Sequence, residues 1–117
     1  MKTTFLILSA LVAIEHIYFL VLEMFYWTKP KGMKAFGQSK EAAESSKVLA
    51  ANQGLYNGFL AAGLIWGLLA DKSDVMVYFL ICVVIAGIYG SYSTKMIKLF
   101  YVQAVPALLA LGIWLLS

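Results

Sequence analysis

Three ionisable side chains interrupt the first apolar segment of the chain, Thr3–Thr28, and their types suit proton chemistry. These residues are Glu15, His16 and Glu23. A charged group near the bilayer centre costs about 2.5–3.5 kcal/mol, so such residues usually mark a functional site. On a helix, His16 and Glu23 share one face, while Glu15 is turned about 100° from His16 at almost the same depth. A carboxyl group beside an imidazole predicts proton exchange at Glu15 and His16.

Polar uncharged side chains accompany these residues on the later apolar segments. When the segments are matched by depth, each places amides or tyrosines in the same half of the membrane. The opposite halves of the three later segments are almost wholly apolar. This asymmetry predicts a polar cavity in the cytoplasmic half. The residues expected to bind a ligand or proton there, besides Glu15, His16 and Glu23, are Asn52, Gln53, Tyr56, Asn57, Tyr89 and Gln103.

Four apolar segments must position these side chains. Of the 117 residues, 62% are hydrophobic and 13% are charged, whereas soluble domains carry about 25% charged residues. The segments predict helices at about 3–28, 40–70, 75–94 and 98–116, each long enough at about 1.5 Å per residue to cross roughly 30 Å of hydrocarbon. Barrel strands would alternate polar and apolar residues, and these segments do not. We therefore expect one all-α domain over residues 1–117, an integral membrane four-helix bundle.

The lysines predict the orientation of this bundle. All nine basic residues are lysines, and seven of them lie in the first and third connections, against two on the opposite side. Cytoplasmic loops carry such an excess, which places both termini on the outer side of the membrane. The net charge of +3 reflects this asymmetry, so no nucleic-acid partner is expected. Within the first connection, a loop is expected from Lys29 to about Ser39, because Pro30 stops the first helix. The first two turns of the second helix, which carry Lys40 and Lys47, are expected to protrude into the cytoplasm and belong to the same connection.

Small residues follow helical spacing in the second and third segments. The second carries Ala50, Gly54, Gly58 and Ala62, and also Gly63 with Gly67, while the third carries the pairs Ala86/Gly90 and Gly87/Ser91. This spacing lets helices approach closely in lipid. We favour packing within the bundle, with the second and third segments as neighbours, over a homodimer face.

A proline interrupts the helical hydrogen bonding of the fourth segment. Pro106 lacks a backbone N–H, which leaves the carbonyl of Val102 without its helical donor. Gln103 lies one turn earlier. A carbonyl and an amide side chain are therefore expected at similar depth.

Several chemistries are excluded by residue counts and motifs. The chain has one histidine and one cysteine, Cys82, which do not make a conventional zinc site. It contains no HExxH motif, phosphate-binding glycine loop or dinucleotide fingerprint. No cofactor is predicted. A homodimer would supply two copies of Glu15, His16 and Glu23, which keeps a metal or haem site open as an alternative.

Three stretches carry a resemblance to a known family: EHIYFLVLEMFYWTKPKGMKAFG at Glu15–Gly37, ANQGLYNGFLAAGLIWG at Ala51–Gly67 and KLFYVQAVPALLALG at Lys98–Gly112. They resemble the bacterial membrane family catalogued as domain of unknown function thirteen-oh-four. The resemblance implies a compact four-helix inner-membrane protein and no particular activity. The layout is also similar to small multidrug resistance exporters, although their motifs around the first-helix glutamate are not visible here.

These observations lead to one main functional hypothesis and two alternatives. The main hypothesis is a proton-linked carrier of a small polar or cationic solute, working as a homodimer in the lipid bilayer. The alternatives are a metal- or cofactor-binding membrane protein and a structural or accessory membrane subunit. An enzyme is not the expected class, because neither a nucleophile nor an acid/base pair beyond Glu15 and His16 is evident.

Overall fold

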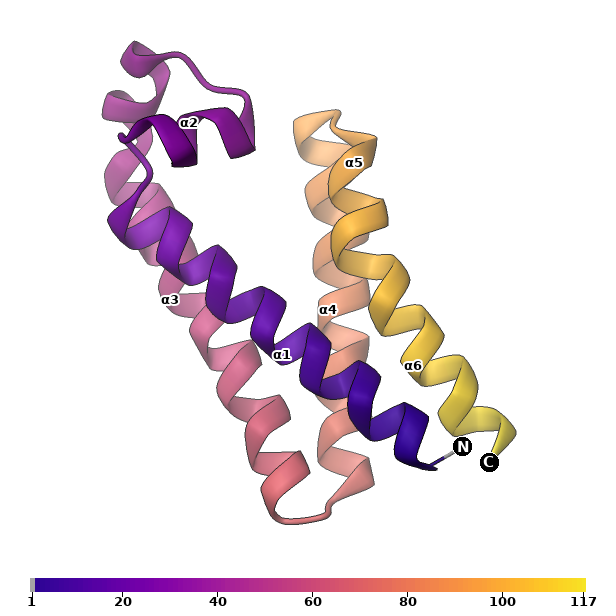
Figure 1. Cartoon of the computed structure of the whole chain (residues 1–117). Coiled ribbons are helices and arrows are strands. Elements are labelled where there is room, and N and C mark those ends of the chain that lie inside the picture. The colour runs from indigo at the N-terminus through magenta and orange to yellow at the C-terminus, as the bar shows by residue number, and fades with distance from the viewer. Residues whose placement is uncertain (1) are drawn as a thin grey trace. The chain divides into compact units, whose positions relative to one another are not determined.

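The structure, a computed structural model, describes residues 2–117 and is all-α over this range (Figure 1). The elements follow the expected apolar segments closely, except in the first connection and before Pro106. In chain order they are α1 (Lys2–Phe25), α2 (Pro30–Phe36), α3 (Lys40–Leu69), α4 (Ser73–Thr94), α5 (Ile97–Leu99), the π-helical turn η1 (Phe100–Ala104) and α6 (Val105–Leu116).

Three of these helical segments are long and apolar enough to cross a membrane: Lys2–Phe25, Ser73–Thr94 and Ile97–Leu116. The prediction of four such helices is therefore confirmed for three. The helix α3 has the length, but a polar first section and the amides Asn52, Gln53 and Asn57 reduce its apolar character. The amides that make α3 a candidate for ligand binding therefore also make it less apolar than the three membrane-length helices.

The described chain divides into two compact units. One contains the residues up to Ile14 together with Leu60–Ser117, and the other is Glu15–Phe59. The helices α1 and α3 each contribute residues to both units.

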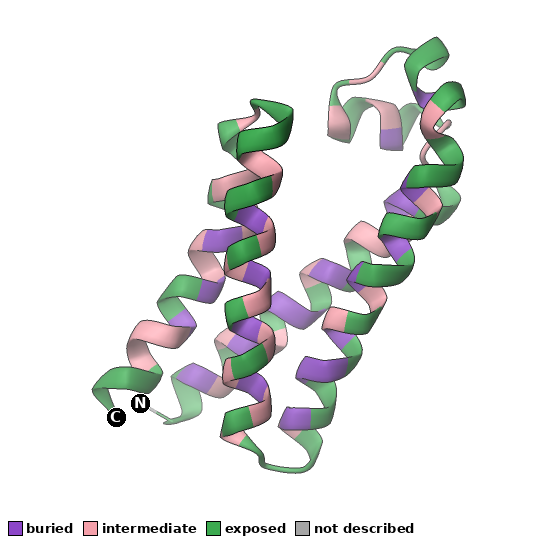
Figure 2. Ribbon diagram, turned by 180° about the vertical axis from the view of Figure 1, so that it is seen from behind, coloured by how far each residue is buried: buried purple, intermediate pink, exposed green. Residues whose placement is uncertain are grey.

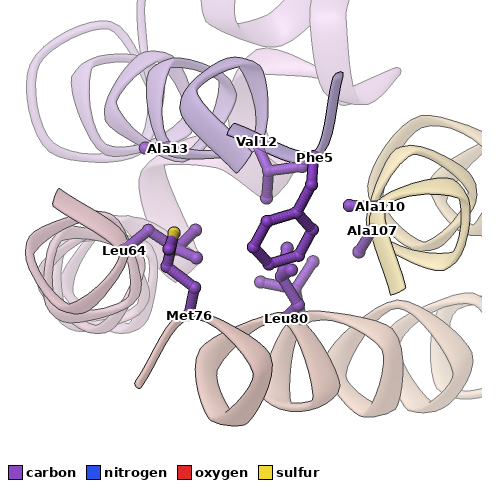
Figure 3. Close-up of a cluster of buried hydrophobic side chains, with 9 residues drawn as sticks. Phe5, Val12, Ala13, Leu64, Met76, Leu80, Ala107 and Ala110 are labelled. Carbon is purple, nitrogen blue, oxygen red and sulfur yellow. The ribbon is translucent and has the colours of Figure 1, made fainter. Parts of the chain in front are cut away.

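The first unit has an apolar core formed by four helical segments (Figure 3). On α4 the buried residues Met76, Leu80, Val83 and Gly87 recur every three or four positions, and Figure 2 shows buried and exposed positions alternating along the helices. Of these, Met76, Leu80 and Val83 belong to the core, together with Phe5, Val12 and Ala13 of α1, Leu64 of α3, and Ala107 and Ala110 of α6. The alanines of α6 let its backbone approach the larger side chains.

Glycines bring α3 and α4 together in this unit. A Cβ atom on Gly63 would collide with the ring of Phe79, and one on Gly67 would lie 2.5 Å from Cγ of Met76. The prediction that the second and third segments are neighbours, with their small residues used inside the chain, is confirmed at these positions.

The expected loop after the first segment contains a helix. α1 ends at Phe25 and Pro30 starts α2, because proline suits the first helical turn, where a backbone N–H has no partner. Gly32 lies against the carbonyl of Tyr26, where a Cβ atom would not fit, and Gly37 ends α2 with a left-handed φ of 63°. This tight packing was not visible in the apolar pattern, which is weak over seven residues.

The fourth segment is helical but irregular before its proline. η1 occupies Phe100–Ala104, and the N–H of Val105 donates to the carbonyl of Phe100, five residues earlier. Pro106 lacks the N–H that would continue the regular ladder, so the wider turn occurs where the helix bonding is already interrupted. Gln103 lies within this turn.

Candidate functional site

A carboxyl–amide pair forms the centre of the candidate site in the unit Glu15–Phe59. Asn57 of α3 donates a hydrogen bond from Nδ2 to Oε1 of Glu23, which lies near the end of α1, with 2.5 Å between the two atoms. The two residues are only 7% and 8% exposed. A buried carboxyl group needs such a donor, because an unsatisfied polar group away from water costs about 1–3 kcal/mol.

The pair forms because α1 and α3 approach closely at a glycine. A Cβ atom on Gly54 would lie 3.2 Å from Cβ of Glu23 and 3.3 Å from the carbonyl oxygen of Leu20. Gly58, one turn further along α3, faces the side chain of Leu20. The small-residue ladder of α3 therefore packs against α1 here, in agreement with the favoured interpretation of packing within the chain.

A hollow of about 370 Å³ lies next to Glu23. The C-terminal end of α1 and the following turn form one side, and α3 forms the other. Its walls combine one buried carboxyl group with an indole, a lysine, an amide and apolar side chains. The lining residues are Glu23, Met24, Phe25, Trp27, Thr28, Lys47, Val48, Ala51 and Asn52.

Two side chains of this hollow have interactions outside it. Trp27 donates from Nε1 to Oγ of Ser46 at 3.1 Å, and its ring lies 4.9 Å from that of Phe36. Nζ of Lys47 lies 3.3 Å from Oε2 of Glu44, and both side chains are largely exposed. The indole is therefore held in place, and the lysine charge has a partner of opposite sign.

Glu15 and His16 lie earlier on α1 and differ in their surroundings. His16 is fully buried, and its ring meets that of Phe19 edge-on at 5.2 Å. Oε1 of Glu15 is buried and has no hydrogen-bond partner among the described residues. This oxygen is thus a buried acceptor that a ligand, a water molecule or a proton would satisfy.

The other expected site residues divide between the two units. Asn52 lines the hollow beside Glu23, whereas Gln53 and Tyr56 are exposed on α3. Tyr89 on α4, 68% exposed, and Gln103 in η1 belong to the other unit. The structure therefore brings Glu23, Asn52 and Asn57 to one place, and a cavity with contributions from every segment stays a prediction.

The described residues form no site that is ready to hold a metal ion, which bears on the metal-binding alternative. Over residues 2–117 no group of three or more histidine, cysteine, aspartate or glutamate side chains is placed to hold a metal ion. Glu15, His16 and Glu23 thus do not gather as one ligand set in this chain.

Trp27, Thr28 and Lys47 contribute to the hollow but were not expected as site residues. Tryptophan commonly lies near a membrane interface, which gives Trp27 an ordinary role, and Lys47 was counted only in the lysine excess of the first connection. Trp27 follows Glu23 by four positions, and a helix places such residues on one face. That spacing was the available signal, although α1 ends at Phe25 between them.

Comparison with known proteins identifies the family. The family model described as "Protein of unknown function (DUF1304)" matches residues 10–115. The chain belongs to this family. It is also similar to the "Uncharacterized protein YpaA" of Lactococcus lactis subsp. lactis (strain IL1403), with 34% identity over 110 residues that cover 91% of this chain and 92% of that protein. No solved structure matches the chain.

The DUF1304 assignment confirms the resemblance carried by the three sequence stretches. The match includes α1 from Ala10 onward, so Glu15, His16 and Glu23 fall within it, as do the amides of α3. The family description states no activity.

Proposed function

We propose that this chain is an integral protein of a bacterial inner membrane in which α3 is the fourth membrane-spanning helix. The three apolar helices Lys2–Phe25, Ser73–Thr94 and Ile97–Leu116 support membrane insertion. Large apolar side chains are widely exposed, including Leu49, Leu69 and Leu115 at 73%, 84% and 74%. Soluble monomers rarely expose such surfaces over large patches, whereas lipid chains cover them. In the proposed orientation both termini are outside and α2 is cytoplasmic.

Cysteine labelling tests this orientation. In a Cys82→Ala background, single cysteines replace Ala35 in α2, Ser93 near the end of α4 and Lys72 between α3 and α4. A membrane-impermeant maleimide is expected to label only the Lys72→Cys protein in right-side-out membrane vesicles, and the Ala35→Cys and Ser93→Cys proteins only in inverted vesicles. The reverse pattern would contradict the proposed orientation, and equal labelling of all three from one side would contradict the four spans.

Within this membrane protein we propose a proton-linked carrier for a small polar or cationic solute. The observation that carries the proposal is the buried Glu23–Asn57 pair at the wall of a hollow of about 370 Å³. Pockets for small ligands have volumes of about 300–1,000 Å³ and combine apolar walls with a few placed polar groups. This hollow has both properties.

Glu15, with His16, is the proposed proton-exchanging group. Carboxyl groups within membrane helices commonly serve as proton relays. Oε1 of Glu15 has no hydrogen-bond partner among residues 2–117, which leaves it available to bind a proton. A proton carried at Glu15 and a solute bound at Glu23 would provide the two binding events that a coupled carrier needs.

Proton movement in proteoliposomes tests this function. Pyranine enclosed in the vesicles reports internal pH when a gradient of N-butylpyridinium, a cation, or erythritol, a neutral solute, is imposed. At least one gradient is expected to drive proton movement, and Glu15→Gln is expected to abolish it. Glu41→Gln is the matched control, because it makes the same chemical change at an exposed position in the polar first turn of α3.

Two results would overturn parts of the proposal. If Glu15→Gln leaves a demonstrated flux unchanged, Glu15 is not the coupling group. If neither solute moves protons in the unmodified protein, the carrier is rejected for these solute classes, and the Glu23–Asn57 bond is better explained as a packing contact of an accessory subunit.

We also propose a homodimer, because four short helices enclose little volume. Light scattering of the detergent-solubilised protein measures the protein mass directly.

A further inference from the structure

We infer that the hollow beside Glu23 binds an organic ammonium cation that carries an apolar substituent. The inference rests on the proposed function and names the substrate class of the same site. It follows from three properties of the hollow: the charge of its lining residues, the small number of oxygens that could coordinate an ion, and the apolar and aromatic character of its walls.

The charge of the lining favours a cation. Among the residues that line the hollow, Glu23 and Lys47 carry charged side chains. Lys47 is largely exposed and lies 3.3 Å from Glu44, so its charge is already matched from outside the hollow. Glu23 is 8% exposed, and it accepts its hydrogen bond from the neutral amide of Asn57. In its ionised form, Glu23 is therefore the acidic group at this wall whose charge no lining side chain matches.

The kind of cation follows from the number of oxygen ligands. Calcium takes six to eight oxygen ligands, and magnesium requires near-octahedral geometry. In the described residues no metal-binding group of three or more acidic, histidine or cysteine side chains occurs. A single carboxylate, with the Asn52 amide and the Thr28 hydroxyl also lining the hollow, suits a monovalent organic cation, which needs one ion pair and no full set of oxygen ligands.

The apolar and aromatic side chains in the walls of the hollow determine which substituent the cation must carry. Met24, Phe25, Val48 and Ala51 present apolar surface to the hollow, and Trp27 adds an indole. Aromatic faces attract alkylated ammonium ions, with tryptophan giving the strongest interaction. Trp27 is held by Ser46 and Phe36 outside the hollow, so the ligand does not have to order it. A cation with an apolar body therefore uses both the carboxylate and the walls.

Quenching of Trp27 fluorescence measures this binding directly. In a background with Trp66→Phe and Trp114→Phe, Trp27 is the only tryptophan of the chain. The full-length protein in nanodiscs of zwitterionic lipid is titrated with N-butylpyridinium, a cationic quencher. The expected result is saturable quenching whose half-saturating concentration rises about tenfold in Glu23→Gln, because the ion pair between the cation and the carboxylate is lost. Quenching by neutral acrylamide is expected to stay the same in that variant.

Two further variants complete the test. Glu41→Gln makes the same chemical change as Glu23→Gln, but at a position outside the hollow. It is expected to leave the half-saturating concentration unchanged. Ala51→Phe keeps Glu23 and Asn57 but fills the hollow, and it is expected to weaken binding of N-butylpyridinium. Quenching that rises linearly without saturation, or equal half-saturation in the parent and Glu23→Gln proteins, would overturn the inference.

The outcomes separate this inference from the proposed carrier. Saturable binding of N-butylpyridinium without proton movement on either gradient supports the cation site and overturns the carrier. Proton movement on the erythritol gradient together with no saturable quenching supports a carrier and overturns the cation site.

Discussion

Gly87→Ala is expected to destabilise the protein by roughly 2 kcal/mol, because the added methyl group overpacks a helix crossing. A Cβ atom at Gly87 would lie 2.9 Å from Cβ of Ala104 and 3.1 Å from its backbone nitrogen. Both atoms are fixed to the backbone of η1, so no side-chain rotation can move them aside. Unfolding of the purified protein by increasing fractions of SDS, followed by circular dichroism, measures the change in free energy.

Gly90→Ala is the matched control for this prediction. Gly90 lies one turn further along α4, and a methyl group added there would meet no other atom within 4 Å. Its replacement is expected to be neutral or stabilising by up to about 1 kcal/mol, because alanine is the better helix former. Equal destabilisation by the two substitutions would show that α4 and η1 are not in close contact at Gly87.

Removal of the Asn57 amide is expected to have the second large effect on stability. Asn57→Ala should destabilise the protein by about 1–3 kcal/mol, because it leaves the buried carboxyl group of Glu23 without its donor. The matched control is Gln53→Ala, which removes an exposed amide one turn away on α3 and should change stability little. SDS unfolding of both variants compares them under one condition.

A double-mutant cycle isolates the interaction between the two side chains. We expect a coupling energy of about 1.5 kcal/mol between Glu23→Gln and Asn57→Ala, towards the upper end for polar bonds between membrane helices. The high value is expected because both side chains are almost fully buried. Additive effects of the two substitutions would show that Asn57 stabilises α3 by some contact other than the bond to Glu23.

The candidate site was partly visible in the sequence. Glu23 and Asn57 were both expected in a polar region, because an acid and an amide within apolar segments are costly and therefore informative. Their direct bond was not predicted, since it depends on how α1 and α3 are rotated about their axes. Trp27 and Lys47 were missed as lining residues, because each also has an ordinary role near a membrane interface.

The all-α class, three membrane-length apolar helices and most helix boundaries could be predicted from the sequence alone. These properties depend on local composition, on the apolar periodicity and on prolines such as Pro30, all of which can be read along the chain. Which small residues are in contact depends on the tertiary structure. Gly87 and Gly90 look equivalent in the sequence, yet only Gly87 lies against Ala104.

The same distinction applies to the site. Gly54 brings α1 and α3 close enough for Asn57 to reach Glu23, while Gln53, a neighbouring amide with the same chemistry, is exposed. Residue type therefore predicts which side chains are costly to bury. The contact point between two helices and their rotation determine which of those side chains meet, because adjacent positions on a helix point about 100° apart.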